Sequence, residues 1–191
     1  MLNVMMAVLL AGAGTATAAG PTETVQKAVE QVFSQPGGPG VKTVSTAQRR
    51  ADIRQIAGGL FDFDEMSERS LGGAWTQASP AQQQEFVRLF STLIATTYMG
   101  KIEQYAGEPI AYVGERVDGD EAAVQSRVVT PKGSEVGLEY RMHRAAGRWT
   151  VYDIHVDGVS LASSYKAQFN RIIQRGSFSD LLKQLREKVG S

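Results

Sequence analysis

The spacing of apolar residues changes along this chain from the period of a helix to that of a strand and back. Before Gly107, apolar side chains recur every three or four positions. From Pro109 to Val156 they alternate with polar residues, and helical spacing returns after Gly158. Alternation of this kind is typical of antiparallel strands with one buried face. Helices, then strands, then helices predict an α+β fold.

The alternating region predicts a four-stranded antiparallel meander. Residues Ala122–Val128 and Val136–Met142 carry an apolar side chain at every second position, and on the last strand Tyr152, Ile154 and Val156 do the same. Three turn signals separate the strands: Asp118-Gly119, Pro131-Lys132-Gly133 and Ala146-Gly147. We expect helices to cover the apolar face of this sheet, with an apolar cavity between sheet and helices.

Capping signals set the expected helix boundaries. Ser79, Pro80 and Gln82 form a helix start with a capping box, and Gly107 is the expected stop of this long helix. The same reasoning predicts helices that begin at Ser160 and Ser177. Shorter helices are expected near Thr22–Phe33, Ser45–Ala57 and Asp64–Leu71, with Gly58-Gly59 interrupting the second of them.

Composition removes several classes of function. Twenty basic residues balance twenty acidic ones, so the broad positive field that attracts nucleic acid is missing. Since the chain has no cysteine, disulfide frameworks and thiolate chemistry are excluded. Its two histidines make a histidine-based metal cluster improbable, and we expect neither a metal nor a cofactor.

The N-terminus predicts export. Val4 to Ala13 is a short apolar run, and Ala16-Thr17-Ala18 has the small-x-small pattern that signal peptidase recognises. We therefore expect residues 1–18 to be a signal peptide and residues 19–191 to form a single domain. No later segment approaches the roughly 20 apolar residues that a transmembrane helix needs.

Two residue patterns have the composition of a catalytic or metal site. Asp153, His155 and Asp157 alternate on one strand face, which is suited to a metal or to a base with its orienting acid. Gly158-Val159-Ser160 begins like a nucleophile elbow, so a hydrolase using Ser160 with His155 is one hypothesis. A solvated strand face and a helix cap are the simpler interpretations of these two patterns.

Several short motifs along the chain carry a family resemblance. They are Phe61-Asp62-Phe63, Leu71-Gly72-x-x-Trp75, Phe86-x-x-x-Phe90 followed by Thr97-Tyr98, Gly147-x-Trp149-x-Val151-Tyr152-Asp153, Gly158-Val159-Ser160-Leu161 and Tyr165-x-x-Gln168-Phe169. With these motifs the chain resembles the periplasmic phospholipid-carrier component of the bacterial lipid-asymmetry (Mla) transport system, also called the toluene-tolerance substrate-binding family. The motifs cover essentially the whole expected mature chain.

The resemblance implies a periplasmic, non-enzymatic shuttle that encloses the acyl chains of a phospholipid. It also implies two partners: an inner-membrane ABC transporter complex with its lipid-binding subunit, and an outer-membrane lipoprotein complex. A related branch of the family is associated with hopanoid metabolism, so a hopanoid is the alternative cargo. Lys166 stands where the family often has arginine, which weakens any bidentate contact with a phosphate.

The facing of the predicted elements, independent of the motifs, selects the residues expected to line the lipid cavity. They are Leu71, Trp75, Phe90, Ile94, Tyr98, Tyr105, Val128, Tyr140, Met142, Tyr152, Ile154, Val159, Tyr165 and Phe169. From periodicity alone an apolar face is either such a cavity or an ordinary core. A solid-cored protein-interaction domain is therefore the main rival hypothesis.

Overall fold

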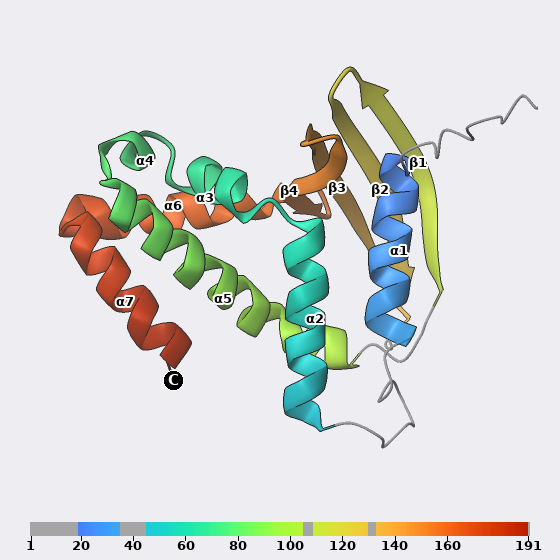
Figure 1. Ribbon diagram of the computed structural model, residues 1–191, viewed down its shortest axis with the longest axis horizontal. Helices are drawn as coiled ribbons and strands as arrows, with labels where there is room; N and C mark the ends of the chain where they lie inside the picture. Colours follow the sequence, from blue (N-terminus) through green and yellow to red (C-terminus); the bar gives the residue numbers. More distant parts are fainter. Residues whose placement is uncertain (1–18, 35–44, 105–108, 130–132, 191) are drawn as a thin grey trace, which may run out of the picture.

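Five strands form one antiparallel sheet in chain order (Figure 1), in a computed structural model that describes residues 19–34, 45–104, 109–129 and 133–190. The strands are β1 (Ile110–Asp118), β2 (Glu121–Val129), β3 (Glu135–Ala145), β4 (Arg148–Val156) and β5 (Val159–Ser160). The meander is as predicted, but the expected four strands become five.

The additional strand, β5, arises from a tight hairpin after β4. Val156 pairs with Val159 and His155 with Ser160, which leaves Asp157 and Gly158 as a two-residue loop. Both loop residues have positive φ, 48° and 81°, as a type I′ turn requires. From the sequence, helical spacing was expected to return directly after Gly158, so this hairpin was not predicted.

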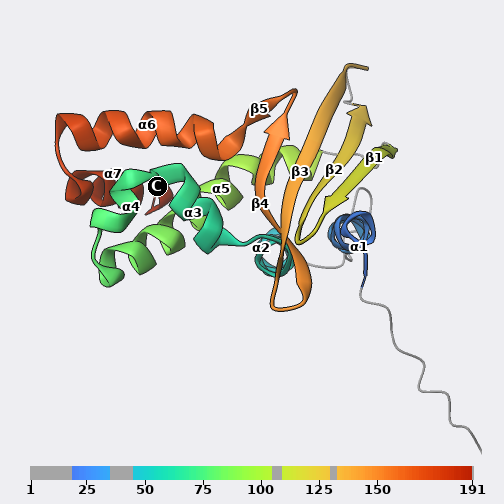
Figure 2. The ribbon, with the colours of Figure 1, turned by 90° about the horizontal axis from the view of Figure 1, so that it is seen from above.

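Two helices, α1 (Pro21–Ser34) and α2 (Thr46–Leu60), cover part of the apolar face of the sheet (Figures 1 and 2). Val25 of α1 and Leu60 of α2 are buried in a cluster with Val124, Met142 and Val151 of the sheet. Ser45 caps α2 as expected, its Oγ accepting from Gln48 N–H at 3.2 Å. The predicted interruption at Gly58-Gly59 is wrong, because α2 continues to Leu60.

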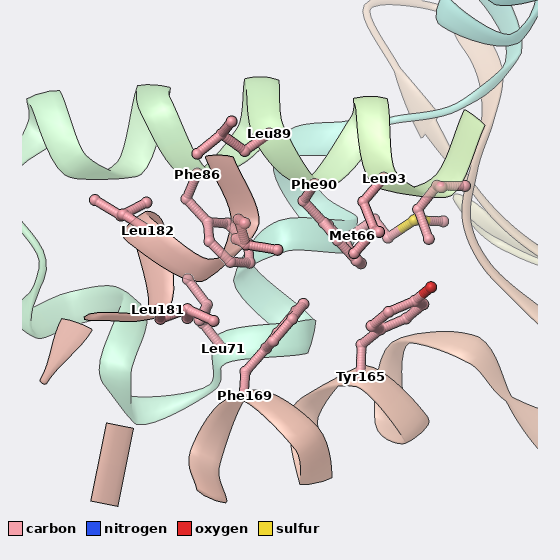
Figure 3. Packing of buried hydrophobic residues seen from close by; sticks show 12 residues of the cluster. Met66, Leu71, Phe86, Leu89, Phe90, Leu93, Tyr165, Phe169, Leu181 and Leu182 are labelled. Carbon is pink, nitrogen blue, oxygen red and sulfur yellow. The ribbon is translucent and has the colours of Figure 1, made fainter. Parts of the chain in front are cut away.

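The remaining helices form a second group beside β4 (Figure 2). They are α3 (Phe63–Leu71), α4 (Gly73–Gln77), α5 (Pro80–Gln104), α6 (Leu161–Arg175) and α7 (Phe178–Gly190). Their own apolar cluster joins Phe86 and Phe90 of α5 to Tyr165 and Phe169 of α6 (Figure 3). The short α4 was not predicted, and the expected stop of α5 at Gly107 lies outside the described residues.

The molecule therefore has two apolar clusters instead of one layer of helices over a sheet. Phe61, between α2 and α3, packs against both clusters and makes a parallel bridge to Val151. The prediction that helices cover one face of the sheet is confirmed for α1 and α2. It is wrong for α3, α4, α6 and α7, which pack on one another and on α5, with only α3 and α6 also packing against β4.

Candidate functional site

The sheet has one apolar and one polar face, and their side chains form cross-strand rows. On the apolar face one row joins Ala122, Met142 and Val151, and the next joins Val124, Tyr140 and Ile154. Further along the strands come a row through Tyr112, Ser126, Leu138 and Val156 and a last row through Ile110, Val128 and Val136. The faces of β2 and β3 are those that their alternation predicted.

Helices α1 and α2 bury only one half of this apolar face. Val124, Met142 and Val151 under these helices have no exposed area. Towards the other end of the strands, six apolar side chains are only partly covered by the described residues: Ile110, Val128, Val136, Leu138, Ile154 and Val156. We call these six residues the apolar strip. Contiguous apolar surface that the fold leaves partly open is a common mark of a binding site.

A groove of about 670 Å³ opens at the opposite end of the same face, between α1, α2 and the turn joining β3 to β4. Ala28, Ile56, Leu60 and Trp149 give it apolar walls, while Lys27, Asp52 and Arg148 are among its polar lining. Its volume falls within the roughly 300–1,000 Å³ of small-molecule sites. None of the thirteen predicted lining residues that the structure describes lies in this groove.

The fourteen predicted lining residues do not form one surface. Seven belong to or pack against the helical cluster: Leu71, Trp75, Phe90, Ile94, Tyr98, Tyr165 and Phe169. Tyr140, Met142 and Ile154 belong to or pack against the sheet cluster, and Val128 and Ile154 are in the apolar strip. Val159 is 62% exposed at the tip of the β4–β5 hairpin, and Tyr105 lies outside the described residues.

The helical cluster is packed as a solid core (Figure 3). Phe90 meets Tyr165 and Phe169 edge to face, with ring centroids 5.1 and 5.4 Å apart. Phe86 stacks on Phe90 at 5.4 Å and meets Phe169 at 5.3 Å. These arrangements are the favoured ones for aromatic pairs, so this group contributes to folding.

Tyr152 lies on the polar face, which corrects its predicted place beside Ile154 and Val156. A β-bulge between Arg141 and Met142 pairs Met142 with Val151 and Arg141 with Asp153, so Tyr152 is the extra residue. Its ring lies under the Arg69 guanidinium at 4.0 Å and its hydroxyl is 3.4 Å from Glu121. A bulge reverses the alternation at the point where it occurs.

Two members of the row of Asp153, His155 and Asp157, the aspartates, make structural hydrogen bonds. Asp153 is buried and accepts from Ser160 Oγ at 2.5 Å and from Ala162 N–H at 3.0 Å, which fixes the start of α6. Asp157 accepts from Gly137 N–H at 2.8 Å. Ser160 Oγ also accepts from Ser163 N–H at 3.0 Å, as the predicted cap. Since the Ser160 hydroxyl donates to Asp153, it is not aligned with His155 as a nucleophile.

A polar junction at Asp62 was missed by the sequence analysis. Asp62 caps α3 through Glu65 N–H at 3.0 Å, its own N–H donates to Val151 O at 2.9 Å, and its Oδ2 lies 2.9 Å from His143 Nε2. Only the acidic first turn of α3 was visible in the sequence. The partner histidine is 81 residues away, so no local pattern indicates it.

Burial affects two tyrosines beside the apolar surfaces. It raises the pKa of Tyr98, with a smaller contribution from Tyr165, and it raises the pKa of Tyr140 against an opposing effect of Ser126. On the polar face, hydrogen bonds from Gln125 and Arg141 lower the pKa of Glu139. The apolar surfaces are therefore lined by neutral tyrosines, whereas the polar face of the sheet carries charge.

Two searches over the described part of the chain gave negative results. No group of three or more His, Asp or Glu residues there is placed to bind a metal ion. None of the helices in residues 19–34, 45–104 and 133–190 has the length and apolar content needed to cross a membrane.

Comparisons with known proteins point to one family. The model of the family described as MlaC protein matches residues 26–187. The toluene tolerance protein ttg2D of Pseudomonas putida is 24% identical over 125 residues, covering 64% of this chain and 58% of that protein. The intermembrane phospholipid transport system binding protein MlaC of Haemophilus influenzae is 23% identical over 124 residues, covering 62% and 58%. The matches thus span less than two thirds of either relative.

A solved structure extends the likeness to nearly the whole chain. It is the phospholipid-binding protein from Ralstonia solanacearum in complex with a phospholipid, with a TM-score of 0.79 and 30% sequence identity. The match covers 90% of this chain and 98% of that one. The motif resemblance, the family model and this structure agree: the chain belongs to the MlaC protein family.

Proposed function

We propose that this protein is a periplasmic carrier that encloses the acyl chains of a phospholipid and moves the lipid between membranes. The observation that carries the proposal is the apolar strip, which the described helices leave half-covered beside the buried part of the same sheet face. The phospholipid complex of the Ralstonia relative, which shares the fold, supports the same cargo.

The energetics require an enclosed site for such a cargo. Burying a methylene group is worth about 0.8 kcal/mol, so one long acyl chain exposed to water would cost on the order of 10 kcal/mol. The apolar side chains of the strip come from β1, β2, β3 and β4, so a bound acyl chain would have several neighbours along its length. The strip supplies one wall of the enclosure.

A carrier also needs donors and acceptors of its cargo. We propose an inner-membrane ABC transporter complex with a lipid-binding subunit and an outer-membrane lipoprotein complex, in keeping with the transport system named for the Haemophilus relative. Transfer would proceed without catalysis or a cofactor, since Ser160 and Asp153 are engaged with each other and with the start of α6. Export through a signal peptide at residues 1–18 belongs to the same proposal.

A charge placed in the strip tests the site. Val128→Lys should lower the loading of delipidated protein with a fluorescent phospholipid at least tenfold, because a lysine at this position puts an ammonium against the acyl chain. Val117→Lys is the matched control, since Val117 is on the same sheet face but is 48% exposed. Thermal melts followed by circular dichroism confirm that both variants fold.

Equal loading of Val128→Lys, Val117→Lys and the wild type would remove the strip from the lipid site. A hopanoid recovered in place of a phospholipid from the purified wild type would keep the carrier and change its cargo. Absence of any lipid would leave the protein-interaction domain as the better hypothesis.

A further inference from the structure

The groove of about 670 Å³ between α1, α2 and the β3–β4 turn is separate from the apolar strip. The two helices run side by side in opposite directions (Figure 1), and each presents one stripe of side chains to the groove. The stripes are Thr24, Lys27, Ala28 and Gln31 from α1, and Asp52, Gln55, Ile56, Gly59 and Leu60 from α2. On β4, Val151 has no exposed area and lies between Trp149 of the groove and Ile154 of the strip. The groove is therefore a second hollow, which the proposed carrier function does not use.

The space in the groove comes from small residues in its walls. Ala28 of α1 and Gly59 of α2 both line it. A Cβ added at Gly59 would meet no atom within 4 Å, so the room in front of this residue is open. Glycine inside a helix is less favourable than most larger residues. A larger side chain at Gly59 would thus favour the helix while filling the groove.

The length and walls of the groove suit one short apolar chain. Ile56, Leu60 and Trp149 are the large apolar residues of its lining. On α2 the lining runs from Asp52 to Leu60, which is about 12 Å at the helical rise of 1.5 Å per residue. A medium-length acyl chain, such as that of octanoate or decanoate, extends over this distance. The two long chains of a membrane phospholipid do not fit within it.

The charges of the lining favour an anionic head on that chain. Lys27 and Arg148 are cationic, whereas Asp52 supplies one carboxylate. Lys27 lies 2.5 Å from Glu23 of its own helix, and Asp52 accepts from Gln48 at 2.8 Å. A guanidinium can donate two parallel hydrogen bonds to a carboxylate. Arg148, at the β3–β4 turn, is therefore the residue best suited to hold such a head.

We propose that the groove binds a medium-chain fatty acid, with its alkyl chain along Ile56 and Leu60 and its carboxylate at Arg148. This site is distinct from the one proposed for the phospholipid and does not depend on the carrier function. Each buried methylene should raise the affinity about fourfold, so decanoate should bind more tightly than octanoate, and octanoate more tightly than hexanoate. Decanol, which has no charge, should bind about tenfold more weakly than decanoate.

The test is calorimetric titration of the full chain with decanoate. Gly59→Leu should weaken binding at least tenfold, because the leucine fills the groove. Gly58→Leu is the matched control: Gly58 is in the same helix, a Cβ there also meets nothing within 4 Å, and Gly58 does not line the groove. This control should bind decanoate like the wild type. Thermal melts followed by circular dichroism confirm that both variants fold.

Two further titrations examine the head and the independence of the site. Arg148→Gln should bind decanoate about tenfold more weakly and decanol with unchanged affinity, since only the charged ligand uses the guanidinium. Because Arg148 is exposed, this variant keeps the proposal testable if a leucine variant fails to fold. Loading the protein with phospholipid beforehand should leave the affinity for decanoate unchanged.

Four results would overturn the assignment. They are a wild type that binds no decanoate, equal affinities of Gly59→Leu and Gly58→Leu, equal losses for decanoate and decanol in Arg148→Gln, and displacement of decanoate by phospholipid. The first three need no phospholipid binding by the protein, so failure of this proposal is distinguishable from failure of the carrier function.

Discussion

Gly72 joins α3 to α4 in a backbone conformation that only glycine adopts readily, with φ at +55°. A Cβ at this position would lie 2.7 Å from Cε of Lys166, so the second motif of the family resemblance meets the last one here. The end of a lysine side chain moves aside at little cost. The positive φ, and not the contact with Lys166, is therefore the main reason that this position requires glycine.

Gly72→Ala should therefore lower the free energy of unfolding by about 1–2 kcal/mol, the cost of a left-handed residue with a side chain. Gly58→Ala is the matched control: Gly58 is helical and a Cβ there meets nothing within 4 Å. That substitution should stabilise the protein by about 0.5–1 kcal/mol. Denaturant melts of the two variants measure both effects, and equal losses would refute the assignment of Gly72.

The sheet face on which each side chain lies could be predicted from the sequence, except where the strand pairing is irregular. Val124 and Val128 share a sheet face as their spacing indicates, whereas Tyr152 is displaced by the bulge opposite Arg141 and Met142. Such a bulge depends on two strands together.

At the scale of elements, local chemistry determined the helix starts. Ser79 N–H donates to Gln82 Oε1 at 2.9 Å and Gln82 N–H donates to Ser79 Oγ at 3.3 Å, which is the predicted capping box of α5. Ser177 accepts from Asp180 N–H at 3.1 Å at the start of α7. Gly58-Gly59 failed to stop α2, because two exposed glycines cost only about 1 kcal/mol each and Leu60 beyond them is buried.

An ion pair between α5 and α7 predicts how these elements respond to pH. Arg186 donates to both oxygens of Glu85, at 2.7 and 3.0 Å, and lowers the pKa of that carboxyl. Because the pKa of Glu85 is lower in the folded protein, the charged carboxylate stabilises the fold at pH values above its usual pKa of 4.5. This stabilisation is lost as the pH falls through the lowered pKa.

A double-mutant cycle of Glu85→Gln and Arg186→Gln should thus show a small favourable coupling at pH 7. The coupling should weaken with added salt, because the pair is exposed to solvent. It should vanish in strong acid, because the Glu85 carboxylate is then protonated and carries no charge. Melting temperatures of the four proteins at two pH values give the result. A coupling that persists in acid would show that packing, not charge, joins these side chains.

At the scale of the whole molecule, the fold class could be predicted and the arrangement of its helices could not. Apolar periodicity shows that α5 and α6 bury one face, but it does not say against which element. Phe90 and Phe169, two of the predicted lining residues, pack together in the helical cluster and not on the sheet. The alternation placed Val136 and Leu138 on the apolar face of the sheet, but only the packing shows that they are half-covered.

Native mass spectrometry of the wild-type protein purified from a periplasm is the most direct test of the carrier function. The account predicts a complex of one chain with a phospholipid, which dissociates to the bare chain on denaturation and forms again when delipidated protein meets phospholipid vesicles. A bare chain both after purification and after incubation with vesicles would contradict it.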